Sequence, residues 1–238
     1  MEHLPAYISV VFGITTLLTI WFAWRAAHKS TPFLGIIGGW MVVQSFVAYT
    51  GFYTVTHTMP PRMILMLLPP LLLIIWVFAT AEGRAFVDSL DLKMLTWLHV
   101  VRVPVEFTLL WLFLYGQVPQ LMTFEGRNFD ILSGLTAPVV AWLAFEKQRL
   151  SPKIALVWNF ICLGFLFNIA FHGVLSVPFR FQQFAFEQPN VALLYFPFVL
   201  LPGLIVPLVL FSHLVAIRKL LRQLSHPQSR HLGASKIP

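Results

Sequence analysis

Seven apolar stretches, each long enough to cross a lipid bilayer as a helix, account for most of this sequence. A helix needs about 20 mainly apolar residues to span the hydrocarbon core. Such stretches, bounded by charges or by Pro and Gly, cover residues 5–24, 33–55, 63–79, 94–115, 131–145, 154–177 and 191–217. With 58% hydrophobic residues, 11% charged residues and a mean hydropathy of +0.79, the chain falls outside the range of soluble proteins. The sequence therefore predicts an all-α polytopic membrane bundle of about seven transmembrane helices, of which the fifth is the weakest.

The distribution of Lys and Arg predicts the orientation of these spans. Basic residues close to span ends are retained in the cytoplasm. With the N-terminus outside, the inner segments contain twelve Lys and Arg residues, and the outer segments contain three, Arg62, Arg127 and Arg180. Tyrosines fall in outer halves of spans and most tryptophans toward inner ends, as interfacial aromatic belts would place them. We expect a cell-membrane location, one transmembrane domain over residues 1–217 and a basic cytoplasmic C-terminal tail over residues 218–238.

The charge and cysteine content limit the partners and cofactors of the chain. The net charge of +7 is spread over inner segments and tail, which favours contact with anionic inner-leaflet lipids and not with nucleic acid. The single cysteine, Cys162, excludes a disulfide framework and a thiolate metal cluster. Because the segments between spans are short, function is expected within the bundle, at its ends or with a partner chain. A small-molecule ligand and a homo-oligomer stay open.

A polar stripe on the fourth predicted span is the strongest candidate site. His99, Arg102 and Glu106 lie at relative angles of about 0°, 300° and 340° for a helix that turns 100° per residue. A charge at the bilayer centre costs at least about 2.5 kcal/mol, so this stripe should face the bundle interior. The spacing permits an Arg102–Glu106 ion pair, and Pro104 leaves a carbonyl without its donor. We expect this stripe, together with Gln44 of the second span, to form a substrate or proton site; a structural ion pair is the alternative.

Histidines in three spans are candidate ligands for a metal or a haem iron. His99 and His213 are expected at similar depth near the inner ends of their spans, where two neutral imidazoles on facing helices can hold such an ion. His172 lies in the outer half of the sixth span, four residues after Asn168. Hydrogen bonding between helices is the alternative interpretation of these residues. The sequence does not specify a cofactor.

Four further features carry predictions about local structure. The densest polar cluster outside the predicted spans lies in an outer loop and comprises Glu125, Arg127, Asn128 and Asp130. Residues 82–93 are expected to form a short amphipathic helix in the interface. Pro69 and Pro70 predict a kink or a cavity lining in the third span. Three glycines of the second span, Gly35, Gly38 and Gly39, predict close helix packing.

Three function classes fit these features. The first is a small-solute or proton-linked transporter or channel in which Arg102 binds an anionic group and Glu106, the only carboxylate within a predicted span, exchanges a proton. The second is a membrane enzyme or a haem- or metal-binding protein that uses intramembrane histidines. The third is a non-catalytic membrane subunit or sensor whose polar stripe only holds helices together. Ionisable groups beside a proline in mid-membrane favour the first class, and whether the chain is an enzyme stays open.

Overall fold

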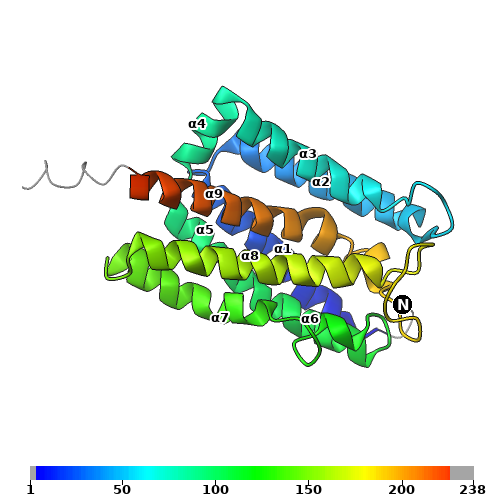
Figure 1. Cartoon of the computed structure of the whole chain (residues 1–238). Coiled ribbons are helices and arrows are strands. Elements are labelled where there is room, and N and C mark those ends of the chain that lie inside the picture. The colour runs from blue at the N-terminus through cyan, green and yellow to red at the C-terminus, as the bar shows by residue number, and fades with distance from the viewer. Residues whose placement is uncertain (1–3, 226–238) are drawn as a thin grey trace, which may run out of the picture.

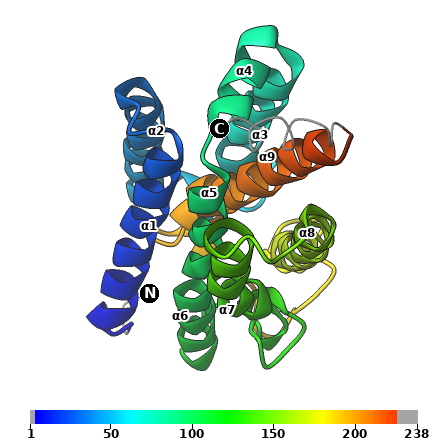
Figure 2. The ribbon, with the colours of Figure 1, turned by 90° about the vertical axis from the view of Figure 1, so that its left-hand side faces the viewer.

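A computed structural model describes residues 4–225, which form an all-helical bundle without strands. Apart from the short helix α4, the helices run roughly along one common direction (Figure 1), and their ends are seen in Figure 2. The α-helices are α1 (Ala6–Ala26), α2 (Thr31–Tyr49), α3 (Ile64–Ala79), α4 (Ala81–Ser89), α5 (Leu92–Leu98), α6 (Arg102–Leu114), α7 (Asp130–Ala141), α8 (Pro152–Leu175) and α9 (Val206–Ser225). Residues 226–238 of the predicted tail lie outside the described residues.

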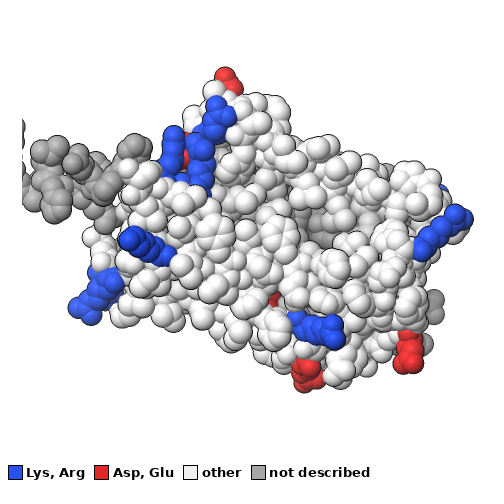
Figure 3. Space-filling model, in the orientation of Figure 1, with Lys and Arg blue, Asp and Glu red and all other residues white. Residues whose placement is uncertain are grey.

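Several of these helices are candidates to span a membrane. Five helical segments are long and apolar enough, namely α1, α2, Leu92–Leu114, α8 and Leu201–Ser225. A sixth is obtained if α3 and α4, bent by 94° relative to each other, are taken as one broken span. Charged side chains lie mainly toward the two ends of the visible face, and few lie in the broad band between them (Figure 3). Helix α7 corresponds to the fifth predicted span, and even with the π-helical segment Trp142–Glu146 it is short. The prediction of seven crossings therefore rests on α7.

Helices α5 and α6 form one long helix that is interrupted at the polar stripe. The interruption is the 3-10 turn His99–Val101. Pro104 has no amide hydrogen, and its ring opposes the carbonyl of Val100 four residues earlier. The chain tightens into a 3-10 turn just before this proline, as is common at helix ends. This broken helix packs against α1, α7 and α9, so its polar residues are enclosed.

Helices α2 and α3 lie at the periphery of the bundle (Figure 2). Many of their apolar side chains are exposed, among them Val42, Phe46, Ile75 and Trp76, as expected for helices that face lipid. A Cβ atom added at any of the three glycines of α2 would meet nothing within 4 Å. The prediction that these glycines mediate close helix packing is therefore wrong within this chain. Their small size leaves open space instead.

Helix α4 is the short helix predicted over residues 82–93, but it ends at Ser89, and Leu92 and Lys93 belong to α5. It is anchored to the end of α9. Gly83 permits the bend after α3, because a Cβ there would lie 2.2 Å from the carbonyl oxygen of Val77. Asp88 accepts hydrogen bonds from Arg218 at 3.0 and 3.1 Å and also pairs with Arg222. The hydrogen bond from Arg218 is the main reason why the pKa of Asp88 is lowered. We call this end of the bundle the α4 end.

Candidate functional site

A buried ion pair joins α6 to α7 in the middle of the bundle. The Nε atom of Arg102 lies 2.9 Å from Oδ2 of Asp130, with side chains 3% and 8% exposed. The Nε–H does not meet hydrogen-bond geometry toward that oxygen, so the contact is an ion pair without a linear hydrogen bond. The terminal nitrogens of Arg102 also donate to the carbonyl of Cys162 on α8, at 3.4 and 3.5 Å. Arg102 thus links three helices.

A second carboxyl group lies next to this pair. Glu106 is 1% exposed, and its Oε1 accepts a 2.5 Å hydrogen bond from the side-chain amide of Asn128. The same amide donates to the carbonyl of Met122 at 3.0 Å, and Oδ1 of Asn128 accepts from the backbone N–H of Asp130 at 3.0 Å. Oε2 of Glu106 and Oδ1 of Asp130 have no hydrogen-bond partner. Arg102, Glu106, Asn128 and Asp130 are called the Arg102 cluster below.

Two glycines allow the chain to bring Asn128 and Asp130 inward. A Cβ at Gly126 would lie 2.2 Å from the carbonyl oxygen of Gln120, so only glycine fits where the loop folds back on itself. A Cβ at Gly134 would lie 2.7 Å from a methyl group of Val103, so α7 approaches α6 closely one turn after Asp130. This approach places the start of α7 against Arg102.

The structure corrects the predicted composition of the site. Arg102 pairs with Asp130 and not with Glu106 of its own helix, because α7 delivers a carboxylate directly to the guanidinium. Glu106 is therefore not the only buried carboxylate. The predicted outer polar loop is divided: Glu125 and Arg127 are exposed as expected, whereas Asn128 and Asp130 are buried in the cluster.

Gln44 does not join the cluster. It is fully buried and accepts a 2.6 Å hydrogen bond from the hydroxyl of Tyr53. It lies next to Gly203, at the π-helical segment Leu201–Ile205 that precedes α9. The hydrophobic pattern places Gln44 inside the bundle but does not identify which helices surround it.

His99 and His213 are brought together, as their predicted depth suggests. Their rings stack with centroids 4.0 Å apart and planes inclined by 23°. Nε2 of His99 lies 2.8 Å from Oγ of Ser212, and Nδ1 of His213 lies 2.9 Å from Oδ1 of Asn159. The edge of Trp158 covers His99. Both histidines are essentially unexposed, and each has one ring nitrogen without a partner.

This arrangement does not fit a haem iron or a metal held by the three predicted histidines. Axial nitrogens lie on opposite faces of a haem, each about 2 Å from the iron, and rings stacked at 4.0 Å leave no room for a porphyrin. His172 bonds to the backbone of Asn168 and lies 13 residues beyond Asn159 on α8, about 20 Å along the axis. Within residues 4–225 no three His, Cys, Asp or Glu side chains are placed to hold a metal ion.

The fold and these two buried polar clusters define the class of the protein as an all-helical bundle with candidate membrane-spanning helices. The chain belongs to the family described as "Domain of unknown function (DUF8737)", which matches residues 59–221. All residues of the Arg102 cluster and the histidine pair lie inside the matched segment, whereas α1 and α2 precede it. Comparisons with curated proteins and with solved structures gave no match.

Proposed function

We propose that this protein is a proton-linked transporter of a small solute, in which Glu106 carries the proton. The proposal includes seven crossings, with the start of α1 outside and the α4 end in the cytoplasm. Each of the seven predicted stretches contains a helix, although the last helical segment runs from Leu201 to Ser225 and not from residue 191 to 217. The excess of basic residues on alternate connections supports this orientation.

The observation that carries the proposal is the charge balance of the Arg102 cluster. One guanidinium faces two buried carboxyl groups, of which Asp130 is within ion-pair distance. An additional unpaired carboxylate in a low-dielectric interior is very costly, and such a group takes up a proton instead. Glu106 is bound by an amide donor on one oxygen only, so its free Oε2 is the natural position of that proton.

The closed state of the cluster is consistent with the occluded state of a transporter. Every member of the Arg102 cluster is at most 6% exposed, counting backbone and side chain together, so proton exchange requires α6 and α7 to separate. The helices around the cluster contain the irregular turns that permit such movements. A 3-10 turn precedes Arg102, and π-helical segments follow α7 and precede α9; such segments often mark functional sites and hinges.

Proton coupling can be tested before the solute is known. Purified protein is placed in liposomes with an entrapped pH-sensitive dye, and amino acids, sugars and carboxylic acids are added singly. We expect at least one solute to move protons inward, and the isosteric Glu106→Gln variant to abolish this signal while its melting temperature stays within about 5 °C of wild type. The exposed Glu125→Gln variant is the matched control and should behave as wild type. Equal proton movement by Glu106→Gln would discard the assignment of Glu106.

The topology has its own test, centred on α7. In a Cys162→Ser background, E125C and K147C flank this helix. With seven crossings, a membrane-impermeant maleimide labels E125C in intact cells and labels K147C only after permeabilisation. Labelling of both positions from the same side would show that α7 does not cross.

A non-catalytic subunit is the second candidate, favoured by the direct, buried contact between Arg102 and Asp130. A structural pair of this kind holds α6, α7 and α8 together without any exchange of protons. In that case no solute in the panel moves protons, and Glu106→Gln has no activity to remove.

A further inference from the structure

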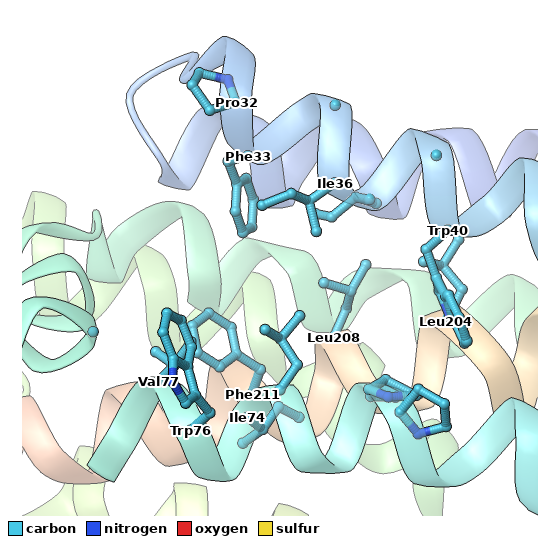
Figure 4. Close-up of a pocket in the computed structure, with 18 of the residues that line it drawn as sticks. Pro32, Phe33, Ile36, Trp40, Ile74, Trp76, Val77, Leu204, Leu208 and Phe211 are labelled. Atoms are coloured by element: carbon cyan, nitrogen blue, oxygen red, sulfur yellow. The ribbon is translucent and has the colours of Figure 1, made fainter. Parts of the chain in front are cut away.

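An apolar groove of about 750 Å³ opens between α2, α3 and the start of α9. Figure 4 shows Phe33, Ile36 and Trp40 of α2 above Ile74 and Val77 of α3, with Leu204 and Leu208 of the α9 segment between them in this view. Apart from Ser30 and Glu82, the side chains that line the groove are apolar or absent. The groove is separate from the Arg102 cluster, which lies between α6, α7 and α8.

Helix-breaking residues create the space and also define one side of it. Gly35 and Gly39 line the groove and have nothing within 4 Å of an added Cβ, so their lack of side chains widens it. Pro207 has no amide hydrogen to donate to the carbonyl of Gly203 four residues earlier. The indole of Trp40 donates to that carbonyl at 2.8 Å. This bond ties α2 to the start of α9 across the groove.

The length of the groove suits the hydrocarbon chains of one lipid leaflet. The α2 lining runs from Pro32 to Val43, about 16 Å at 1.5 Å per residue. The hydrocarbon core of a bilayer is about 30 Å thick, so the acyl chains of one leaflet extend over about half of that thickness. The groove is therefore about as long as these chains are.

One end of the groove has the electrostatics that a phosphate requires. The first turns of α2 and α4 both line this end, and they begin at the caps Ser30 and Thr80. The hydroxyls of Ser30 and Thr80 already accept from the backbone of their own helices, so these N-termini attract an anion through the helix dipole and the remaining N–H groups. Lys29 directly precedes the cap of α2, whereas Arg84 of α4 donates to carbonyls at the end of α3. Glu82 adds one negative charge, which suits a headgroup that also carries an ammonium.

We propose that the groove binds one phospholipid of the surrounding bilayer, with its acyl chains between α2 and α3 and its phosphate at the first turns of α2 and α4. The flanking helices are candidate membrane spans, so hydrocarbon chains surround the groove. The site is independent of proton transport and stands if the role of Glu106 fails.

The test places a large side chain in the groove at a glycine of α2 that lines it. Full-length protein is delipidated in detergent and exposed to vesicles of deuterated phosphatidylethanolamine and phosphatidylglycerol. Bound lipid per chain is then counted by native mass spectrometry. We expect one retained phospholipid on wild type and at least a fivefold loss with Gly39→Phe, whose ring enters the groove. Gly38→Phe is the matched control: it has equal open space on the same helix but does not line the groove, so it should retain the lipid.

A second substitution tests the position of the phosphate. Lys29→Gln should weaken lipid retention two- to fivefold without a change in melting temperature. Unchanged retention in Lys29→Gln would overturn the position of the phosphate. Full retention by Gly39→Phe, or absence of lipid on wild type, would overturn the site itself. A wild-type dimer that Gly39→Phe converts to a monomer would assign the groove to a second copy of this chain instead.

Discussion

The two neighbouring carboxyl groups of the Arg102 cluster should respond to neutralisation in opposite ways. In the Asp130→Asn variant the buried guanidinium loses its counter-ion, and removing one partner of a buried pair costs about 3 to 5 kcal/mol. That is a change of about two to three and a half powers of ten in the unfolding equilibrium. In the Glu106→Gln variant the amide oxygen still accepts from Asn128. If Glu106 is already neutral, the loss is at most one hydrogen bond, about 0.5 to 1.5 kcal/mol.

Reversible unfolding in mixed detergent micelles at neutral pH, followed by tryptophan fluorescence, measures both values. The exposed Glu125→Gln variant should unfold within about 0.5 kcal/mol of wild type, as surface substitutions usually do. A loss for Glu106→Gln as large as that for Asp130→Asn would show that Glu106 is ionised, and it would refute the charge balance on which the proposed function rests.

The double variant Asp130→Asn/Glu106→Gln tests whether the two carboxyl groups share the guanidinium of Arg102. With Asp130 neutralised, Glu106 can release its proton and become the counter-ion of Arg102, which reduces the measured cost. Adding Glu106→Gln removes this alternative counter-ion. The free energy of unfolding of the double variant should therefore fall by more than the sum of the two single losses. Coupling energies between contacting groups are about 0.5 to 3 kcal/mol. Strict additivity would mean that the two carboxyl groups do not share the guanidinium.

Three further outcomes are expected from other parts of the fold. Gly134→Ala should cost about 1 to 3 kcal/mol in the same unfolding assay because the core is overpacked, whereas Gly164→Ala, in open space, should cost nothing; equal effects would contradict the close approach of α7. The pKa of Asp88 is lowered, so its ion pairs stabilise the fold fully at any pH above the ordinary aspartate pKa of 3.8. This stabilisation, about 1 kcal/mol or less, is lost as the pH falls through the lowered pKa. The free energy of unfolding should therefore depend less on acidic pH in Asp88→Asn than in wild type. Trp40→Phe should lower the free energy of unfolding by about 1 to 3 kcal/mol, because the buried carbonyl of Gly203 loses its donor. The loss should be smaller in a Pro207→Ala background, in which the amide of residue 207 can donate to that carbonyl. An equal loss in both backgrounds would contradict this account.

Hydropathy and helical periodicity predict the helices and the inward stripe of this chain well. Both signals are local, and the insertion cost of a charge requires Arg102 and Glu106 to face the interior. The periodicity of one helix does not show which residue of another helix pairs with Arg102. Asp130 follows a polar loop, and the local hydropathy therefore predicts that its side chain is exposed to water.

Its burial depends on non-local geometry. Gly126 and Gly134 each permit a backbone approach that only the folded chain reveals. Both glycines are visible in the sequence, and a glycine four residues after an acidic helix start was a signal that α7 packs closely at that point. The glycines of α2 show the limit of that signal, because the same small residues at Gly35 and Gly39 line open space.

The two polar clusters lie on either side of the break in the long helix. His99 directly follows α5 and is held to α9 by Ser212 and by the stacked ring of His213. Arg102 begins α6 and is held to α7 by a single buried ion pair with Asp130. Only a 3-10 turn lies between them. If α6 and α7 part at the ion pair, the bend is therefore expected at this turn, because α5 stays anchored to α9 while the Arg102 cluster opens. If Glu106 carries the proton as proposed, the break in the helix before Pro104 links proton exchange to a movement of α7 against the rest of the bundle.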